Sequence, residues 1–486
     1  MSEFDVMFSN ATVIDGSGAE RYSAHVYVKG DSIADIERLE GNSAVSGHSA
    51  SRTIDASGKV LAPGFIDAHT HDDLLLLKSP HMEPKTTQGV TTVVTGNCGI
   101  SLAPMQSRKL VPPFDLIGDE HDFAYPSVDD YASRLDDQPA SLNSVMLTGH
   151  ASLRLEAMDD LQRGATAKEI QTMRKRLEGA LQHGAIGMST GLAYPTAVHA
   201  PTSEVTELAA VLNDYGAIYT SHMRNEEDQL LESVEETLQI GRDANVPVVI
   251  SHHKACGRKN WGKTRESIGM IEAARKTQRV DLDVYPYTAS STVLLPDFVA
   301  RSERVTITWS KSAPECSGRD LGELCREWQI DVASAIERLN PAGAIYHQMD
   351  DDDLHRVMQY GPSMIGSDGL PKDERPHPRL WGTFPRVLGY YCRDLQLFTL
   401  EQAIEKMTAR PAEVFGLERR GQIRTGWHAD LVLFDANTII DRATYESPTE
   451  PSVGVEMVMV NGAAVLQNGQ ITENRPGRFL RHRHAA

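Results

Sequence analysis

Cysteine is scarce in this sequence, and basic residues are outnumbered. The 486 residues include five cysteines, and none of them forms a CxxC pair. An odd and sparse set of this kind argues against a disulfide framework. There are 48 basic residues against 67 acidic ones, which leaves a formal net charge of −19. Because a field of that sign repels a phosphate backbone, we expect no nucleic-acid partner.

Long hydrophobic runs are also missing. The longest leucine run covers only residues 74–77, which is far too short to cross a bilayer. The opening residues, MSEFDVMFSN, lack the basic start and apolar core of a signal peptide. We therefore expect a cytoplasmic protein without a membrane partner. No strand-like segment is followed by a GxGxxG or Walker-type glycine pattern, which argues against a nucleotide-binding open sheet.

Short apolar runs alternate with longer amphipathic ones through the middle of the chain. The stretches AKEIQTMRKRLEGALQHG and EDQLLESVEETLQIGRDAN read as helices, and alternation of strand with helix indicates βα units and a parallel sheet. Eight such units favour a (β/α)8 TIM-type barrel, with a doubly wound open sheet as the alternative. The eight candidate strands are GFIDAHTH, TTVVTGNCG, SVMLTGH, GAIGMSTG, AIYTSHM, VPVVISHH, VDLDVYPY and MIGSDG.

Both ends of the chain look β-rich. Segments such as DVMFSNATVIDGSG near the start and VEMVMVNGAAVLQNGQI near the end alternate apolar and polar residues around glycine-containing turns. This shared texture predicts that residues 1–61 and 417–486 pack together as one small β-sandwich domain. The catalytic barrel would then occupy residues 62–416, with an insertion near 288–345 that covers the site.

Polar residues recur where the expected strands end. In a closed barrel these ends surround one mouth, where active sites are built. His69 and His71 are two apart in a strand, so both imidazoles face one side. Imidazole and thiolate are ligands that zinc accepts, and Asp368 could bind a metal and also take a proton from water. The candidate metal ligands are His69, His71, Cys98, His222, His252 and Asp368, and His150 is a further candidate for a direct role.

Each of these residues also has a plainer interpretation. His69 and His71 could be exposed polar residues at a strand end, and Cys98 could be a small buried hydrophobe. A buried structural histidine is the competing interpretation for His150. The shared register at strand ends favours the metal interpretation, because scattered histidines have no reason to follow it.

Several stretches together resemble a known family. The His-x-His motif, TSHMRNE, ISHHK and GSDG resemble the amidohydrolase superfamily. Within it, GNCGIS, GMSTGLAYP, YPYTASST and HPRLWGTFPRVLG resemble the N-acyl-D-amino acid deacylases, or D-aminoacylases, close to their N-acyl-D-glutamate branch. The resemblance implies a barrel with a small β-domain. It also implies a zinc held tightly by Cys98, His222 and His252, and a second, weaker site at His69, His71 and Asp368, with Cys98 bridging.

The fourth strand segment, GAIGMSTG, contains no lysine. Many members of the superfamily bridge two metals with a carboxylated lysine at that place, so its absence agrees with a cysteine bridge. It also argues against cyclic-amidase sites of the hydantoinase or dihydroorotase type.

The activity that the resemblance implies is zinc-dependent hydrolysis of N-acyl-D-amino acids to a D-amino acid and a carboxylate. Asp368 would act first as base and then as acid. The α-carboxylate of the substrate needs donors, and the resemblance assigns this role to Lys254, Tyr285 and Arg379, with Ser291 as a further candidate. Arg379 suits a bidentate grip, and a surface ion pair with Asp373 or Glu374 is its alternative interpretation.

The preferred side chain of the substrate stays open between acidic and apolar. An acidic side chain would need a second cation, yet Phe298 stands where the resemblance leads us to expect an arginine. Arg301 or Arg304 could replace it, or the pocket could be apolar. The alternative functions are another amidase or dipeptidase of the superfamily and a non-catalytic scaffold. The sequence does not give the oligomeric state.

Overall fold

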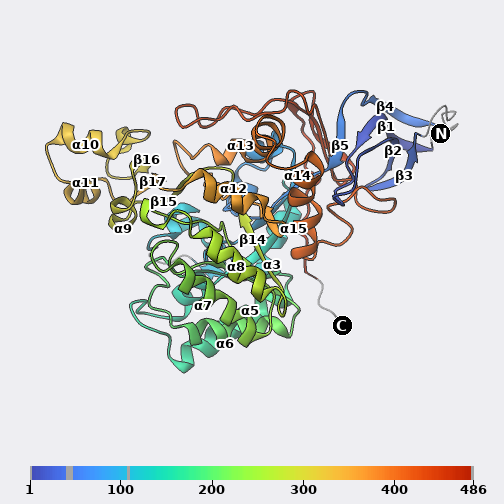
Figure 1. The fold of residues 1–486 in the computed structure, drawn as a ribbon. Helices are drawn as coiled ribbons and strands as arrows, with labels where there is room; N and C mark the ends of the chain where they lie inside the picture. Colours follow the sequence, from blue (N-terminus) through green and yellow to red (C-terminus); the bar gives the residue numbers. More distant parts are fainter. Residues whose placement is uncertain (1–2, 40–47, 107–109, 483–486) are drawn as a thin grey trace.

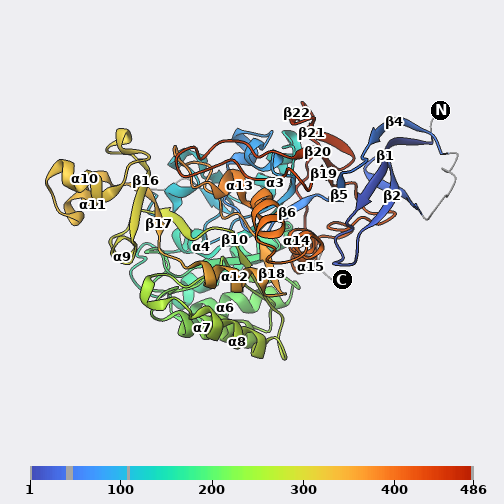
Figure 2. The ribbon, with the colours of Figure 1, turned by 45° about the horizontal axis from the view of Figure 1, so that its top comes forward.

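The computed structural model describes residues 3–39, 48–106 and 110–482. A barrel of parallel strands forms its centre (Figure 1). The strands near the N-terminus lie at one end of the molecule, and helices α10 and α11 lie at the other end in both views (Figures 1 and 2). Within the described ranges, no helix is at once long enough and apolar enough to cross a membrane.

Eight parallel strands make up the barrel, and they are those that the sequence predicts. Thr70 bridges Gly369 in parallel fashion, and the amide of Asp368 donates to the carbonyl of His69 at 2.8 Å, so the first and last strands meet at the mouth. The predicted (β/α)8 fold is thereby confirmed. In spatial order the strands are β6 (Phe65–Asp67), β7 (Val90–Thr95), β10 (Asn143–Gly149), β11 (Gly187–Gly191), β12 (Ile218–His222), β13 (Val248–Ile250), β14 (Val280–Val284) and β18 (Ser363–Ile365).

The barrel strands are almost entirely buried, because side chains fill the inside and helices cover the outside. Ile66, Val94, Val145 and Ile186 belong to one apolar cluster together with Phe415, which follows the last helix. The barrel is thus a packed core that supports the polar residues at its mouth.

Helices follow most of the barrel strands, and capping residues begin several of them. Thr166 and Glu169 form a capping box at the start of α5, which satisfies backbone amides there. The α-helices outside the insertion are α1 (Leu75–Lys78), α2 (Glu83–Thr86), α3 (Val128–Asp137), α4 (His150–Ala157), α5 (Ala167–Gln182), α6 (Thr202–Asn213), α7 (Leu230–Ala244), α8 (Thr264–Ala274), α12 (Asp351–Gln359), α13 (Arg379–Arg386), α14 (Leu400–Met407) and α15 (Ala409–Val414); α13 continues into the π-helical segment η5 (Val387–Asp394).

Strands from both ends of the chain form one nine-stranded sheet, as expected from their shared pattern. The order is β22-β21-β20-β19-β5-β1-β2-β3, and β4 pairs with β1. Since β5 leads through Gly64 into barrel strand β6, we propose to divide the chain near residues 61 and 417. The bounds are β1 (Phe4–Val13), β2 (Tyr22–Lys29), β3 (Ser32–Arg38), β4 (Ala50–Asp55), β5 (Val60–Pro63), β19 (Leu431–Phe434), β20 (Val455–Val460), β21 (Ala463–Gln467) and β22 (Gln470–Ile471).

A small antiparallel sheet interrupts the barrel pattern between β14 and β18. Its order is β15-β17-β16, and a separate apolar cluster that includes Ile307 and Tyr346 holds it together. Residues of β15 line a cavity at the barrel mouth. The elements are β15 (Ala289–Val293), α9 (Pro296–Ala300), β16 (Arg304–Ser310), α10 (Leu321–Trp328), α11 (Val332–Leu339) and β17 (Ala342–His347).

Candidate metal centre and active site

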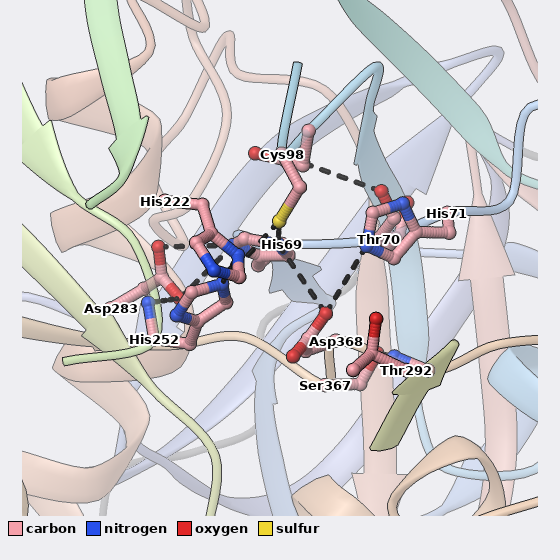
Figure 3. A network of polar contacts seen from close by, with 12 residues as sticks. His69, Thr70, His71, Cys98, His222, His252, Asp283, Thr292, Ser367 and Asp368 are labelled. Atoms are coloured by element: carbon pink, nitrogen blue, oxygen red, sulfur yellow. Dashed lines mark hydrogen bonds and ion pairs between the residues drawn. The ribbon is translucent and has the colours of Figure 1, made fainter. Parts of the chain in front are cut away.

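Six polar side chains converge at the mouth of the barrel (Figure 3). They come from five places: the segment after β6, the loop after β7, the end of β12, the segment after β13, and the loop after β18. Their ligand atoms form two overlapping groups in which all atoms lie within 4.8 Å of one another. The groups are His69, His71, Cys98 and Asp368, and Cys98, His222 and His252.

The first group, which we call subsite 1, is held by the segment after β6 and the loop after β18. The Nε2 atom of His69 lies 3.2 Å from Cys98 Sγ and 3.5 Å from Asp368 Oδ1. His71 Nε2 lies 3.2 Å from the same carboxylate oxygen. One thiol, one carboxylate and two imidazoles therefore point at a common space.

The second group, subsite 2, shares the thiol of Cys98. His252 Nε2 lies 3.4 Å from Cys98 Sγ and 3.0 Å from His222 Nδ1. All three side chains are buried. Two cations placed in the two subsites would thus have Cys98 as their common ligand.

Three residues of this centre have a strained backbone conformation. Cys98, His252 and Asp368 have positive φ angles of 54°, 36° and 51°. Non-glycine residues rarely adopt this region, and they hold it where the surrounding structure compels them. A Cβ atom on Gly191 would lie 2.2 Å from the carbonyl oxygen of Cys98, so the glycine that ends β11 is needed for the close approach of the Cys98 loop.

The centre combines acidic side chains, whose pKa values are lowered, with basic imidazoles that lie between them. Burial opposes the thiolate form of Cys98, but the imidazoles of His69 and His252 outweigh it and lower the pKa of the thiol well below its ordinary value. Burial also opposes ionisation of Asp368, yet Arg379 and His69 lower the pKa of that carboxyl. For His71, burial is outweighed by the hydrogen bond to Asp368, which raises the pKa of the imidazole to about 9.

These residues fit a transition metal. The structure favours an anionic thiolate and an anionic carboxylate between buried imidazoles, and such a donor set calls for positive charge at its centre. The mixture of nitrogen, sulfur and oxygen donors suits zinc.

Two buried carboxylates behind the imidazoles were not among the predicted site residues. Asp283 lies in β14, and its carboxylate is 3.2 Å from His69 Nδ1. Glu226 follows β12, and its Oε1 is 3.0 Å from His252 Nδ1. For Asp283, the signal in the sequence is a pair of aspartates, Asp281 and Asp283, that alternate with apolar residues in the VDLDV segment. For Glu226 we find no signal beyond its place in SHMRNE.

Of the predicted carboxylate-binding residues, Lys254 and Ser291 line the cavity beside the metal centre. Lys254 Nζ donates to Glu226 Oε1 at 2.6 Å. The hydroxyl of Ser291 donates to the carbonyl of Ala344, so it is already engaged within the small sheet. Tyr285 is buried, and its ring lies 5.8 Å from the ammonium of Lys254.

Arg379 begins α13 and is completely buried. Its Nη1 lies 2.8 Å from Asp368 Oδ2, and its Nη2 donates to the carbonyl of Ser291 at 3.0 Å. A surface ion pair for Arg379 is therefore wrong as an interpretation, because the partner is the buried carboxylate of the metal centre.

The structure does not bring His150 or Arg304 into the centre. His150 lies at the start of α4, where its Nε2 is 3.0 Å from Glu204, and Arg154 pairs with the same carboxylate. Arg304 is half exposed on β16 and lies 3.7 Å from Asp320. Both residues serve local ion pairs, which corrects their proposed roles at the site.

Arg301, three residues earlier, takes the place that was considered for Arg304. It lines the cavity, stacks over the ring of Phe298 at 4.0 Å, and pairs with Glu227. Its Nε donates to Gln348 at 2.9 Å. The cavity wall around it also contains the apolar side chains of Leu116, Phe298 and Leu370.

Comparison with known proteins decides the family. The model of the amidohydrolase family matches residues 52–274 and 270–466. The chain belongs to the amidohydrolase family. Among amidohydrolases, the D-aminoacylase of Alcaligenes xylosoxydans xylosoxydans is 50% identical over 98% of this chain and 97% of its own length. The N-acyl-D-glutamate deacylase of the same organism is 45% identical over 99% of this chain and 97% of its own length. The resemblance to N-acyl-D-amino acid deacylases is thereby confirmed.

Solved structures of these amidohydrolases agree with the fold. A crystal structure of D-aminoacylase has a TM-score of 0.95 and covers 98% of this chain and 100% of its own. For D-aminoacylase a binuclear metal centre is described, with activation by one metal and attenuation by a second. The N-acyl-D-glutamate deacylase of Bordetella bronchiseptica, 45% identical with a TM-score of 0.93, was solved with zinc and a phosphonate that mimics the tetrahedral intermediate.

Proposed function

We propose that this amidohydrolase hydrolyses N-acyl-D-amino acids to a D-amino acid and a carboxylate. The observation that carries the proposal is the placement of two cation subsites that share Cys98 beside a cavity lined by Lys254, with the buried guanidinium of Arg379 2.8 Å from Asp368. A linear amide with a neighbouring α-carboxylate fits that combination. The names of the similar proteins support the same substrate class.

The residues that we propose as metal ligands are those of the two subsites. Cys98, His222 and His252 would hold one zinc, and His69, His71 and Asp368 would hold a second cation with Cys98 between them. When bound, zinc supplies Lewis acidity toward the amide carbonyl and lowers the pKa of water. The activation and attenuation described for D-aminoacylase support a functional difference between the two subsites here.

Asp368 is the proposed proton carrier. Arg379 and His69 lower the pKa of its carboxyl, which favours the ionised form, and the side chain lines the cavity at the mouth of the barrel, so it can accept a proton from the attacking water. The same carboxyl then donates that proton to the nitrogen of the leaving amine. Lys254 and Arg379 would bind the α-carboxylate and hold the scissile amide toward the centre.

We propose an apolar rather than an acidic side chain for the preferred D-amino acid. Among the described residues that line the cavity, Arg301 is the one arginine or lysine besides Lys254, and Glu227 and Gln348 already occupy its guanidinium. Binding a buried substrate carboxylate without a free cation is costly. Leu116, Phe298 and Leu370 offer apolar contacts instead.

Cytoplasmic location is part of the proposal, and the cysteines support it. All five cysteines, which lie within the described residues, are free thiols, and Cys98 must remain a thiolate to bind metal.

The test is a substrate comparison on protein that has been stripped of metal and reloaded with ZnCl2. We expect N-acetyl-D-leucine to be hydrolysed with a kcat/KM about 100-fold above that of N-acetyl-L-leucine, and the stripped protein to be inactive. Faster hydrolysis of a dipeptide or of a cyclic amide would favour another amidase of the family. Zinc binding without hydrolysis of any of these compounds would favour a scaffold.

A further inference from the structure

Each subsite contains one imidazole whose rear nitrogen faces a buried carboxylate. In subsite 1, His69 presents Nε2 to Cys98, while its Nδ1 lies 3.2 Å from Asp283 (Figure 3). In subsite 2, His252 presents Nε2 to Cys98, while its Nδ1 lies 3.0 Å from Glu226. Asp283 and Glu226 are 1% and 6% exposed, so water does not compete for these contacts.

The carboxylates select the tautomer that a metal needs. A histidine ligand must offer an unprotonated nitrogen, so Nε2 can bind a cation only when the proton is on Nδ1. A carboxylate accepts hydrogen bonds and cannot donate, so Asp283 stabilises His69 with the proton on Nδ1. An acceptor behind a metal-binding histidine also increases the basicity of the nitrogen that faces the metal.

The tautomer of His252 depends more strongly on its carboxylate, because a lysine that can only donate hydrogen bonds also lies beside Nδ1 of His252. Lys254 Nζ is 2.8 Å from His252 Nδ1, and a lysine ammonium can only donate. Left alone with this ammonium, Nδ1 would lose its proton and Nε2 would carry one, which is the wrong tautomer for binding. Glu226 accepts from Lys254 at 2.6 Å and also faces Nδ1, so it draws the ammonium and the imidazole N–H to one oxygen.

We propose that Asp283 and Glu226 are positioning residues that set the metal affinities of the two subsites separately, Asp283 for subsite 1 through His69 and Glu226 for subsite 2 through His252. The inference rests on the proposed metal centre and deepens it, because it states which residue controls which cation. It does not depend on the identity of the substrate.

The two carboxylates can be tested by isosteric amides. In Asp283→Asn, the amide oxygen can still accept from the backbone N–H of His252, a contact of 2.8 Å in the parent, while the amide NH2 turns to His69 and favours an unprotonated Nδ1. In Glu226→Gln, the charge that restrains Lys254 is lost. Both changes reverse a tautomer with little change in side-chain volume.

Matched controls are available on the same elements. Asp281→Asn changes an acid at the other end of β14, which pairs with Arg275 and Arg410 away from the centre. Asp228→Asn changes an exposed acid two residues after Glu226, which pairs with Lys259. These variants show how much zinc affinity changes when an acidic residue away from the metal centre is lost from each segment.

The experiment is calorimetric titration of metal-stripped protein with ZnCl2, with metal content checked by mass spectrometry. His222→Asn and Asp368→Asn identify which binding step belongs to subsite 2 and which to subsite 1. We expect Asp283→Asn to weaken the subsite 1 step by about 10- to 100-fold and Glu226→Gln to weaken the subsite 2 step to a similar degree. Both control variants should bind zinc like the parent.

The zinc titrations distinguish failure of this inference from failure of the proposed metal centre. Equal weakening of both steps by either variant, or unchanged binding in either variant, would overturn the separate control that we propose. Failure of the parent to bind zinc at all would instead overturn the metal centre and the proposed function with it. Hydrolysis without a shift in the variants would leave the function standing and remove only this inference.

Discussion

Arg379 Nη1 lies 2.8 Å from Asp368 Oδ2, so the proposed carboxylate-binding residue is paired with the proposed proton carrier. Both side chains are buried, and the guanidinium contributes to the lowered pKa of Asp368. A substrate carboxylate that engages Arg379 shares its positive charge. We therefore expect the affinity of Asp368 for a proton to rise when such a substrate binds, which would couple proton transfer to substrate binding.

Replacing Arg379 by Lys tests whether Arg379 binds the α-carboxylate of the substrate. Lysine keeps the charge but loses the planar pair of N–H donors, so we expect KM for N-acetyl-D-leucine to rise about 10- to 100-fold. The methyl ester of the same substrate lacks the carboxylate charge, and its kcat/KM should change much less. Equal losses on the acid and on the ester, measured by steady-state kinetics, would contradict carboxylate binding by Arg379.

The substitution Asp368→Asn removes the proton carrier. We expect kcat to fall by about 10²- to 10⁴-fold, because an amide cannot accept and return a proton. Zinc bound by Cys98, His222 and His252 should stay in place, as measured by mass spectrometry. Asp352→Asn, an exposed acid in the first turn of α12, is the control and should keep the parent kcat. Turnover near that of the parent in the Asp368 variant excludes this role.

The proposed preference for an apolar side chain is argued from the pair formed by Arg301 and Glu227. We expect kcat/KM for N-acetyl-D-leucine to exceed that for N-acetyl-D-glutamate by at least about tenfold, because the charge of Arg301 is already compensated. Glu227→Gln releases Arg301 and should raise kcat/KM for N-acetyl-D-glutamate about tenfold, whereas Asp228→Asn should not. A parent enzyme that prefers the glutamate substrate would show that Arg301 is available to it.

Glu204 gives a prediction about stability and pH. Burial opposes its ionisation, but His150 and Arg154 outweigh it and lower the pKa of Glu204 to about 2. A glutamate in the unfolded chain titrates near about 4.3. The charged form therefore stabilises the fold above that pH, by about 3 kcal/mol, and this contribution is lost as the pH falls through the folded pKa.

The measurement compares Glu204→Gln with the parent in urea unfolding at several pH values. The free energy of unfolding of the variant should be lower at pH 7, and the gap should narrow as the pH falls below about 4. Glu207→Gln, an exposed acid on the same helix α6, should match the parent throughout. If the difference in the free energy of unfolding between variant and parent is the same at pH 7 and pH 3.5, the carboxylate charge does not contribute to stability.

The barrel could be predicted because its signals are local. The run TTVVTGNCG shows an apolar strand followed at once by a polar end, and the structure has β7 at Val90–Thr95 with Cys98 in the next loop. Asp283 was harder to recognise, because an acid inside a strand has meaning only through the histidine it faces. His69 and Asp283 are 214 residues apart in sequence, and no pattern in one segment reports on the other.

The choice between Arg301 and Arg304 likewise could not be made from the local sequence pattern. Both lie in the stretch PDFVARSER, and their spacing alone allows either to face the cavity. The structure ends α9 at Ala300 and begins β16 at Arg304, so Arg301 turns to the cavity and Arg304 turns to solvent and Asp320. The turn between these two elements decided the question.

Short segments are enough to predict which side chains stand at the carboxyl ends of eight parallel strands, because strand periodicity and the order of βα units are local properties. Which of these side chains touch one another depends on contacts between distant segments. The pairing of Arg379 with Asp368, and of Glu226 with both Lys254 and His252, depends on barrel closure and on burial. These bring distant charges to within hydrogen-bonding distance in a place where water cannot screen them.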